Sequence, residues 1–174
     1  FIIASSFILS SILNYFTNLF FKKNNLYDNI NKRSTHNVYS TRSGGFGVGI
    51  SIFIISSAYY ILGFELYDYS ILVPLSLLLV IGLYDDIYSL DFKLKFIFQI
   101  IAAKIIVDTG LIIDNFHGIL GIYELNRAFA QAFTIFIIVA IVNSINFIDG
   151  IDGLALSVTI LFIFCYELLV NSFN

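Results

Sequence analysis

The sequence has no methionine and no tryptophan, and it has a single proline and a single cysteine. Because Cys165 is alone, it cannot form a disulfide bond within the chain. No Cys and His residues recur at the spacing of a zinc site. Neither a G-x-x-x-x-G-K-[ST] phosphate loop nor a nucleophilic Ser or Cys motif is present. These absences exclude an internal disulfide and leave no support for a zinc site, a P-loop or covalent catalysis by Ser or Cys.

Charged residues are also scarce, at 12% of the 174 residues, whereas 59% are hydrophobic and the mean hydropathy is +0.91. A soluble domain could not cover its surface with so few polar groups. We therefore predict an all-α, polytopic membrane protein with one domain over residues 1–174, since no repeat or linker divides the chain. Six apolar runs are candidates to cross a hydrocarbon core about 30 Å thick. They are Phe1–Phe21, Gly44–Gly63, Ser70–Tyr84, Leu94–Ile113, Ala128–Ile148 and Leu154–Val170.

The ends of these runs carry further information. The third run is short, so we expect its helix to begin earlier, near Phe64, or to continue past Tyr84 into the aspartates. The first run lacks the basic region and the cleavage site of a signal peptide, so it is predicted to span the membrane. The chain begins inside this run without a methionine, and we expect the natural N-terminus to lie upstream.

Lysine and arginine are concentrated in alternate loops. The first loop, Lys22–Ser43, holds five of the nine basic residues, and Lys93 and Lys95 follow the third run. By the positive-inside rule the first, third and fifth loops face the cytoplasm, and both ends of the chain lie outside. On the outer side, the segment Asp114–Arg127 alternates apolar and polar residues around two glycines, which predicts a short β-hairpin near residues 112–125. His117 is expected on the surface of this hairpin.

The first polar cluster on the cytoplasmic side is DNINKRSTHNVYSTRSGG. Arg33, His36 and Arg42 are cations close to a Gly44–Gly45 pair that opens the second helix. Backbone N–H groups and the helix dipole can receive a phosphate at such a place. The alternative is that these basic residues only obey the positive-inside rule.

The second cluster is GLYDDIYSLDFKLKFIFQ. Asp85 and Asp86 repel each other at the cytoplasmic end of a membrane helix, and they oppose the helix dipole there. They therefore require a cation, a metal or a substrate proton. Lys95, ten residues after Asp85, is placed to neutralise the pair or to hold a phosphate. The alternative is a solvated loop with a simple Lys–Asp pair.

The third cluster is NSINFIDGIDGLA, in which Asn143, Asn146, Asp149 and Asp152 recur every third residue. Three residues turn an α-helix by about 300°, so one straight helix cannot direct all four side chains to one place. We expect a helix that ends near Phe147, a break at Gly150 and a new helix from about Gly153, with Asp152 as its N-cap. Caps and turn polarity alone remain an alternative for the whole set.

Carboxylates, amides and bases on one membrane face suit a phosphate substrate bound with Mg²⁺. The alternative class is an ion-coupled transporter with a carboxylate-lined path. Lys104 and Asp108, one turn apart in the fourth run, support it best. Transporters place their sites near the midplane, however, and this pair is more simply an i,i+4 pair near the outer end of a helix.

The three polar stretches resemble motifs of the bacterial polyprenyl-phosphate N-acetylhexosamine-1-phosphate transferases of glycosyltransferase family 4. The family pattern N-x-x-N-x-x-D-G-x-D-G-L-A is met at every fixed position. The pattern D-D-x-x-x-L, with a lysine ten residues after the first aspartate, is also met. Prolines usual in the first loop are replaced, for instance by Tyr39 and Thr41. Family members have about ten or eleven helices, so the resemblance implies that this chain is roughly the N-terminal half and is inactive alone.

The resemblance implies transfer of an N-acetylhexosamine-1-phosphate, most simply GlcNAc-1-phosphate, from a UDP-sugar to undecaprenyl phosphate, with release of UMP. This would be the first membrane step of a cell-envelope polysaccharide such as lipopolysaccharide, on the cytoplasmic face of the bacterial inner membrane. The implied cofactor is Mg²⁺, with Mn²⁺ as an alternative. The implied partners are the UDP-sugar, the lipid phosphate and the bilayer, with no nucleic acid and with a homodimer left open.

The resemblance also implies roles for individual residues. Asp85 would bind or deprotonate the lipid phosphate, Lys95 would stabilise phosphate charge, and Asp86 would lie beside the metal. Asp86 and Asp149 are the candidate metal ligands, with the main ligand expected outside this chain. The remaining candidates would bind the nucleotide, pyrophosphate or sugar: Asn143, Asn146, Asp149, Asp152, Arg33, His36 and Arg42.

Overall fold

The computed structural model describes residues 2–27, 41, 43–64, 68–149 and 153–173. These residues form helices and contain no β-strand, so the all-α prediction is confirmed. The elements are α1 (Ile2–Lys23), α2 (Gly44–Ile61), η1 (Tyr69–Ile71), α3 (Leu72–Tyr88), α4 (Phe92–Asp108), η2 (Ile119–Gly121), α5 (Arg127–Ile148) and α6 (Leu154–Phe173), where η marks a short 3₁₀ helix.

Within the described ranges, 4 helical segments are long and apolar enough to cross a membrane: Gly44–Ile61, Tyr69–Tyr88, Arg127–Ile148 and Leu154–Asn171. α1 and α4 are not among them. α4 has 17 residues and carries charges at both ends and in its interior. The prediction of six spans is therefore supported for four helices, and for α1 and α4 it stays a prediction.

Two helix boundaries differ from the hydropathy pattern. α3 continues through both aspartates to Tyr88, as expected from the short third run. α4 ends at Asp108 rather than at Ile113, so the predicted C-terminal boundary was wrong. Gly110 follows with φ of +99°, a left-handed conformation that ends the helix although the next residues are apolar.

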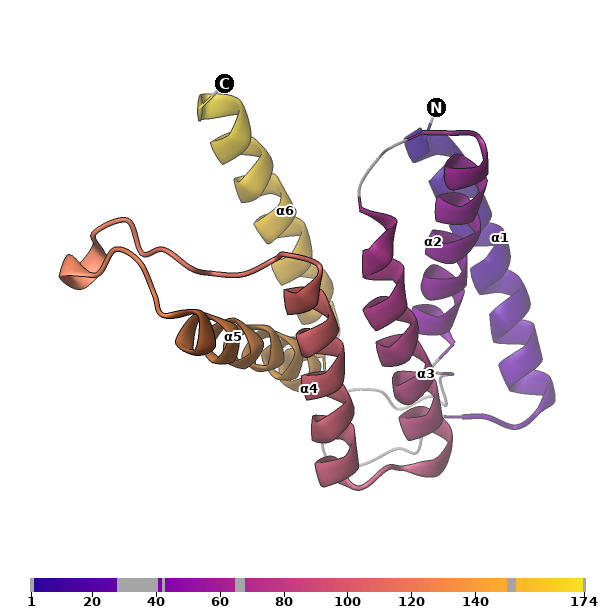
Figure 1. The fold of residues 1–174 in the computed structure, drawn as a ribbon. Coiled ribbons are helices and arrows are strands. Elements are labelled where there is room, and N and C mark those ends of the chain that lie inside the picture. Colours follow the sequence, from indigo (N-terminus) through magenta and orange to yellow (C-terminus); the bar gives the residue numbers. More distant parts are fainter. Residues whose placement is uncertain (1, 28–40, 42, 65–67, 150–152, 174) are drawn as a thin grey trace.

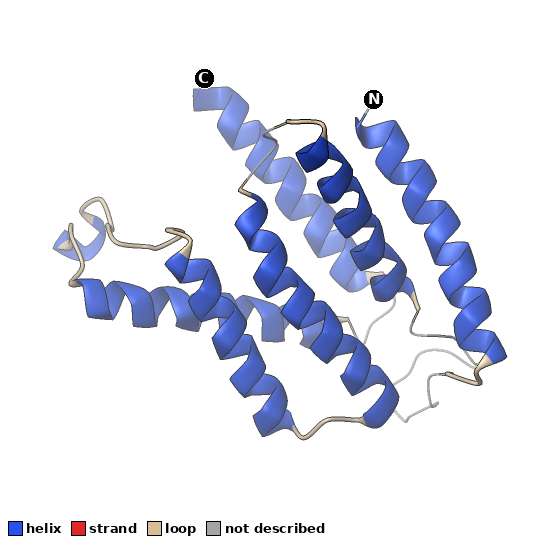
Figure 2. Cartoon of the chain, turned by 45° about the vertical axis from the view of Figure 1, so that its right-hand side comes forward, coloured by secondary structure: helices blue, strands red, loops and turns tan. Residues whose placement is uncertain are grey.

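α1, α2, α3 and α4 run alternately up and down (Figure 1). The lower ends of α1 and α3 and the beginnings of α2, α4 and α6 point to one side, and the N- and C-termini lie on the other. α5 instead runs at a steep angle to α4, which is clearest in Figure 2. The helix ends next to the predicted polar clusters therefore share one side of the protein.

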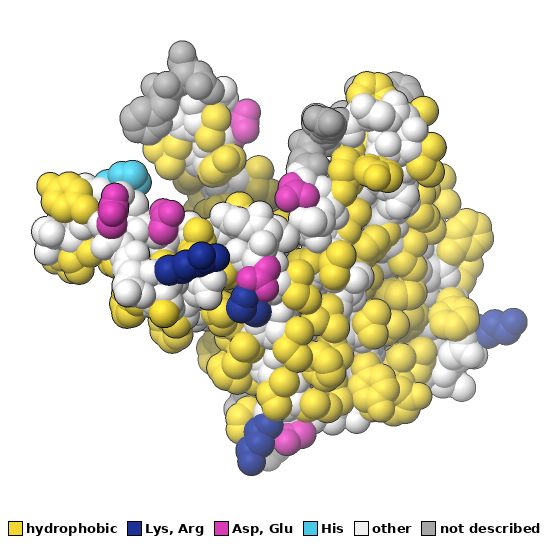
Figure 3. All heavy atoms as spheres, viewed as in Figure 1, with side chains coloured by type: hydrophobic (Ala, Val, Ile, Leu, Met, Phe, Trp, Pro, Cys, Tyr) yellow, Lys and Arg dark blue, Asp and Glu magenta, His cyan; other side chains and the backbone are white. Residues whose placement is uncertain are grey.

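Small residues are among the most deeply buried in the helix contacts. Ala102 and Ala103 of α4 and Ala130 of α5 are almost fully buried, at 1%, 0% and 0% exposure. Small side chains let membrane helices approach closely. Large apolar side chains, in contrast, are mostly exposed along the helices, and Figure 3 shows a broad hydrophobic surface with charged side chains gathered towards its margins. Such a surface fits a bilayer, in which apolar groups do not need to be buried in protein.

The predicted external hairpin is present only in outline. Asn115 and Glu124 form an isolated antiparallel bridge, and the Phe116 N–H donates to the Tyr123 carbonyl at 2.8 Å. The described part of the chain has no strand here, so a hairpin of two strands remains unconfirmed. His117 is exposed, as predicted.

Candidate functional site

The first part of the site is the C-terminal end of α3. Ser89 has φ of +53°, so the chain leaves the helix through a left-handed residue. The Ser89 N–H donates to the Asp85 carbonyl at 2.9 Å, and the Leu90 N–H donates to Asp85 Oδ1 at 3.0 Å. Asp85 thus uses both its backbone and its side chain to satisfy the N–H groups that end this helix.

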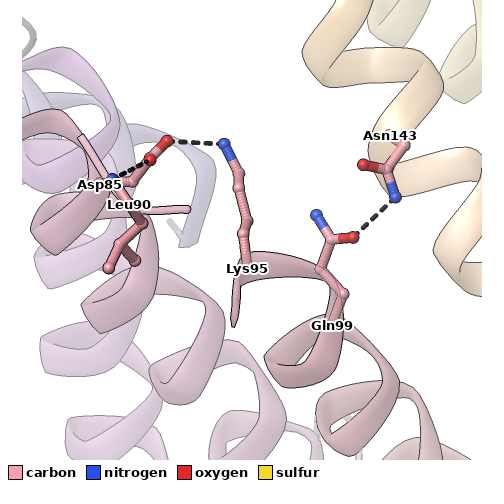
Figure 4. A network of polar contacts seen from close by, with 5 residues as sticks. All are labelled: Asp85, Leu90, Lys95, Gln99 and Asn143. Carbon is pink, nitrogen blue, oxygen red and sulfur yellow. Dashed lines mark hydrogen bonds and ion pairs between the residues drawn. The ribbon is translucent and has the colours of Figure 1, made fainter. Parts of the chain in front are cut away.

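The other oxygen of the same carboxylate binds the next helix. Lys95 Nζ, in the first turn of α4, donates to Asp85 Oδ2 at 2.6 Å. Both side chains are about three-quarters buried, with exposed fractions of 25% for Lys95 and 23% for Asp85. Lys95 therefore pairs with Asp85, which both the predicted site and its alternative of a simple Lys–Asp pair require, and the pair places one cation between α3 and α4 (Figure 4).

Asp86 lies at a different surface. It lines a pocket of about 160 Å³ together with Gly82 and Leu83 of α3 and with Gly45 and Phe46 of α2. Gly45 belongs to the first turn of α2, whose N-cap Ser43 makes no side-chain cap. The pocket therefore lies between a carboxylate and the N-terminus of a helix.

The beginning of the third cluster lies on α5 and reaches α4. Asn143 Nδ2 donates to the Gln99 Oε1 atom at 2.6 Å and to the Val139 carbonyl at 2.8 Å. Gln99 is one helical turn after Lys95 and is only 4% exposed. Figure 4 shows the resulting order of side chains from α3 to α5, namely Asp85, Lys95, Gln99 and Asn143.

Asn146 and Asp149 follow on α5. The helix continues without a break to Ile148, and Asp149 is its C-cap residue. Asn143, Asn146 and Asp149 therefore span about 120° of the helix surface, since each step of three residues falls about 60° short of a full turn. Asn146 and Asp149 are exposed. Their polar groups are oriented by one helix, and this agrees with the predicted end of the helix near Phe147.

Four candidate residues lie outside the described residues: Arg33, His36, Arg42 and Asp152. Their neighbours are in place. Thr41 Oγ1 donates to Asn18 Oδ1 of α1 at 3.0 Å and lies 3.0 Å from Ser43 Oγ, so both flanks of position 42 are attached to α1 and α2. After the third cluster, Gly153 has φ of +75° and α6 begins at Leu154, which is where the new helix was predicted.

The candidate metal ligands supply oxygen only. Among the described residues, no three Asp, Glu, His or Cys side chains lie close enough together to hold a metal ion. Asp86 and Asp149 nevertheless present exposed carboxylates, which with the amide oxygens of the third cluster form the donor type that Mg²⁺ prefers. The residue types therefore fit Mg²⁺, and the ligand assignment remains a prediction.

Two charged features lie away from this site. Lys104 donates to Asp108 in α4, which confirms the predicted i,i+4 pair. At the start of η1, the Ser70 N–H donates to Asp68 Oδ1 at 2.9 Å. This bond, together with a second from the Ser70 side chain, holds the pKa of the exposed Asp68 carboxyl below its usual range. Neither feature involves the residues of the three clusters.

Comparison with known proteins agrees with these motifs. Residues 68–174, which carry the second and third clusters, match the family described as glycosyl transferase family 4. The chain belongs to this family. A curated relative from Bacillus subtilis (strain 168), named "Probable undecaprenyl-phosphate N-acetylglucosaminyl 1-phosphate transferase", is 34% identical over 91 residues. This match covers 51% of the chain but only 25% of the relative. No solved structure matches.

Membership of glycosyl transferase family 4 favours the transferase class over the transporter class considered above. The Lys104–Asp108 contact is then described as an i,i+4 pair within α4. Gln99 was not among the candidate residues that the sequence motifs indicated. It stands at the end of the second stretch, but its partner is 44 residues away, and no local spacing indicates that contact.

Proposed function

We propose that the full-length protein carrying this sequence transfers an N-acetylhexosamine-1-phosphate, most simply GlcNAc-1-phosphate, from a UDP-sugar to undecaprenyl phosphate and releases UMP. The observation that carries this proposal is the Asp85–Lys95 bridge, which places a cation at the end of two helices within the segment matched to the family. The name of the Bacillus subtilis relative supports the lipid acceptor and the sugar.

Lys95 has the clearest role. Transfer brings two anionic phosphates together, and charge develops on the oxygen that leaves with UMP. An ammonium group held between α3 and α4 offsets this repulsion without having to be recruited from solvent. Asp85 fixes the ammonium in position, and the partial burial of both groups strengthens their interaction relative to water.

A general-base role for Asp85 is less well supported by the geometry. Each of its carboxylate oxygens already accepts a hydrogen bond, one from the Leu90 N–H and one from Lys95. A phosphate monoester is also largely ionised at pH 7, because its second pKa is about 6. We therefore assign Asp85 to holding Lys95 and the lipid phosphate site, and no proton needs to be removed by it.

Asp86 and Asp149 would hold Mg²⁺, with Mn²⁺ as a substitute. When bound, the ion would supply charge neutralisation to the phosphates. The exposed Asn146 and Asp149 would line the nucleotide side, and Arg33, His36, Arg42 and Asp152 stay assigned to pyrophosphate, sugar or nucleotide binding. The site would lie on the cytoplasmic face of the bacterial inner membrane, because UDP-sugars are made in the cytoplasm. The protein would act in cell-envelope polysaccharide synthesis.

The test is UMP exchange by membranes that contain the full-length protein. They are incubated with labelled UMP, undecaprenyl-pyrophosphate-GlcNAc and Mg²⁺, and labelled UDP-GlcNAc is the expected product. The label should disappear with EDTA and return with added Mg²⁺. Asp86→Asn should lower the exchange strongly, whereas Asp91→Asn, in the exposed α3–α4 loop, should leave it unchanged. Exchange only with another lipid-linked sugar would mean that the UDP-sugar donor carries that sugar instead of GlcNAc. No exchange with any lipid-linked sugar would refute the proposed transfer reaction.

A further inference from the structure

The orientation of the Asn143 amide is fixed by its own helix. A backbone carbonyl can only accept a hydrogen bond, so the Asn143 atom beside the Val139 carbonyl must be the nitrogen. The assignment of oxygen and nitrogen in this side chain therefore follows from chemistry rather than from shape. Asn143 must then present its second N–H to Gln99.

The orientation of Gln99 follows in turn. Because Asn143 donates at 2.6 Å, Gln99 has to accept with its Oε1 atom. The Gln99 side chain is 4% exposed, which limits the access of water to its amide, whereas Asn143 on the other side of the bond is exposed. Figure 4 shows the Gln99 amide nitrogen on the side of Lys95 and the Asn143 carbonyl oxygen directed to that side as well.

These two bonds restrict what Asn143 can offer a ligand. Both of its amide hydrogens are used, one on Val139 and one on Gln99. Only Oδ1 remains, and it can accept but not donate. A phosphate oxygen is an acceptor and is therefore excluded as its partner. The fitting partner is a hydroxyl or N–H donor on the nucleotide sugar.

We propose that Gln99 is a positioning residue: it locks the Asn143 amide so that its carbonyl oxygen receives a hydroxyl or N–H group of the nucleotide sugar beside the phosphate held by Lys95. This inference rests on the proposed transferase function. Gln99 and Lys95 are four residues apart on α4, so they lie on one face of the helix. α4 thus holds Lys95 and the residue that orients Asn143 at a fixed separation.

The test is a double-mutant cycle on the full-length protein, with kcat and KM measured separately for UDP-GlcNAc and for undecaprenyl phosphate. Gln99→Met removes the acceptor at similar volume. We expect it to raise the KM for UDP-GlcNAc about three- to tenfold, the range for one net hydrogen bond. The KM for undecaprenyl phosphate should stay within about twofold. In an Asn143→Ala background, Gln99→Met should add less than about twofold, because its effect passes through Asn143.

A second variant and a control keep the result interpretable. Gln99→Asn keeps the amide but withdraws it by about 1.5 Å, so it should reproduce the effect of Gln99→Met even if the latter folds poorly. Gln131→Met, on α5 and half-buried, is the matched control and should change neither KM.

Three results would overturn the positioning role. They are an unchanged KM for UDP-GlcNAc, effects of Gln99→Met and Asn143→Ala that multiply, and a rise confined to the KM for undecaprenyl phosphate. A wild-type protein without transfer activity would refute the proposed function and this inference with it. If the wild type is active but the effects of Gln99→Met and Asn143→Ala on KM multiply in the double mutant, only this inference is refuted.

Discussion

Replacing Lys95 with methionine removes the cation of the site while keeping most of the apolar side-chain volume. The bridge to Asp85 is 2.6 Å long, and both side chains are about three-quarters buried. Its contribution to stability should therefore lie above that of an exposed pair and below that of a fully buried one, at about 1–2 kcal/mol. For a domain of this size, 1 kcal/mol lowers Tm by about 2–4 °C.

The effect of Lys95→Met on transfer should be much larger. Removing one preorganised group that stabilises developing charge lowers kcat by about 100- to 1,000-fold. At 25 °C a loss of about 1–2 kcal/mol in stability leaves a protein of ordinary stability folded, so unfolding cannot account for such a decrease. Lys95→Arg should retain more activity, because it keeps the charge although not the compact geometry of an ammonium group.

The assay is Mg²⁺-dependent release of UMP by purified full-length protein, with Tm measured on the same samples. Lys93→Met is the matched control, since Lys93 is exposed and lies two residues away on α4. It removes the same charge without touching Asp85. The reasoning would be refuted if both variants lost activity equally, or if Lys95→Met lost activity only in proportion to folded protein.

Three further predictions concern other parts of the chain. A Cβ at Gly49 would lie 2.6 Å from Leu79, whereas one at Gly82 would meet open space; Gly49→Ala should therefore lower the free energy of unfolding by about 1 kcal/mol or more, and Gly82→Ala should leave it equal or higher in denaturation experiments. Asp68→Ala should destabilise at pH 7. The pKa of Asp68 is lower in the folded state than in the unfolded state. The difference in unfolding free energy between the wild type and Asp68→Ala should therefore be constant above about pH 5 and should become smaller as pH falls below about 4. A difference in unfolding free energy that does not depend on pH would contradict the capping role. Asp149→Asn should lower transfer about 100-fold and raise the Mg²⁺ concentration needed, and an unchanged Mg²⁺ titration would remove Asp149 from the metal site.

The helices were predictable because a membrane protein records them as long apolar runs. Hydropathy alone placed the end of α4 too far along, since the residues after Gly110 are apolar but Gly110 itself is left-handed. It also gave no indication that α5 is steeply inclined to α4 (Figure 2). Both features depend on backbone conformation and helix packing, and neither changes the average polarity of a segment.

The candidate site was predictable where its partners are near in sequence. The Asp85–Lys95 bridge spans ten residues and one short loop, so adjacent charges at two helix ends were enough to indicate it. Gln99 and Asn143 are 44 residues apart, and Gln99 is a single polar residue in an apolar run, for which there are many explanations. Only the packing of α4 against α5 brings them together.

The double use of the Asp85 carboxylate has a consequence for how this position tolerates change. One oxygen satisfies the Leu90 N–H at the end of α3, and the other holds Lys95. A mutational scan scored on the amount of folded protein should therefore mark Asp85 as intolerant, as should a scan scored on turnover. A substitution that removes the carboxylate entirely, such as Asp85→Ala, would remove both the side-chain bond to the Leu90 N–H and the anchor of Lys95.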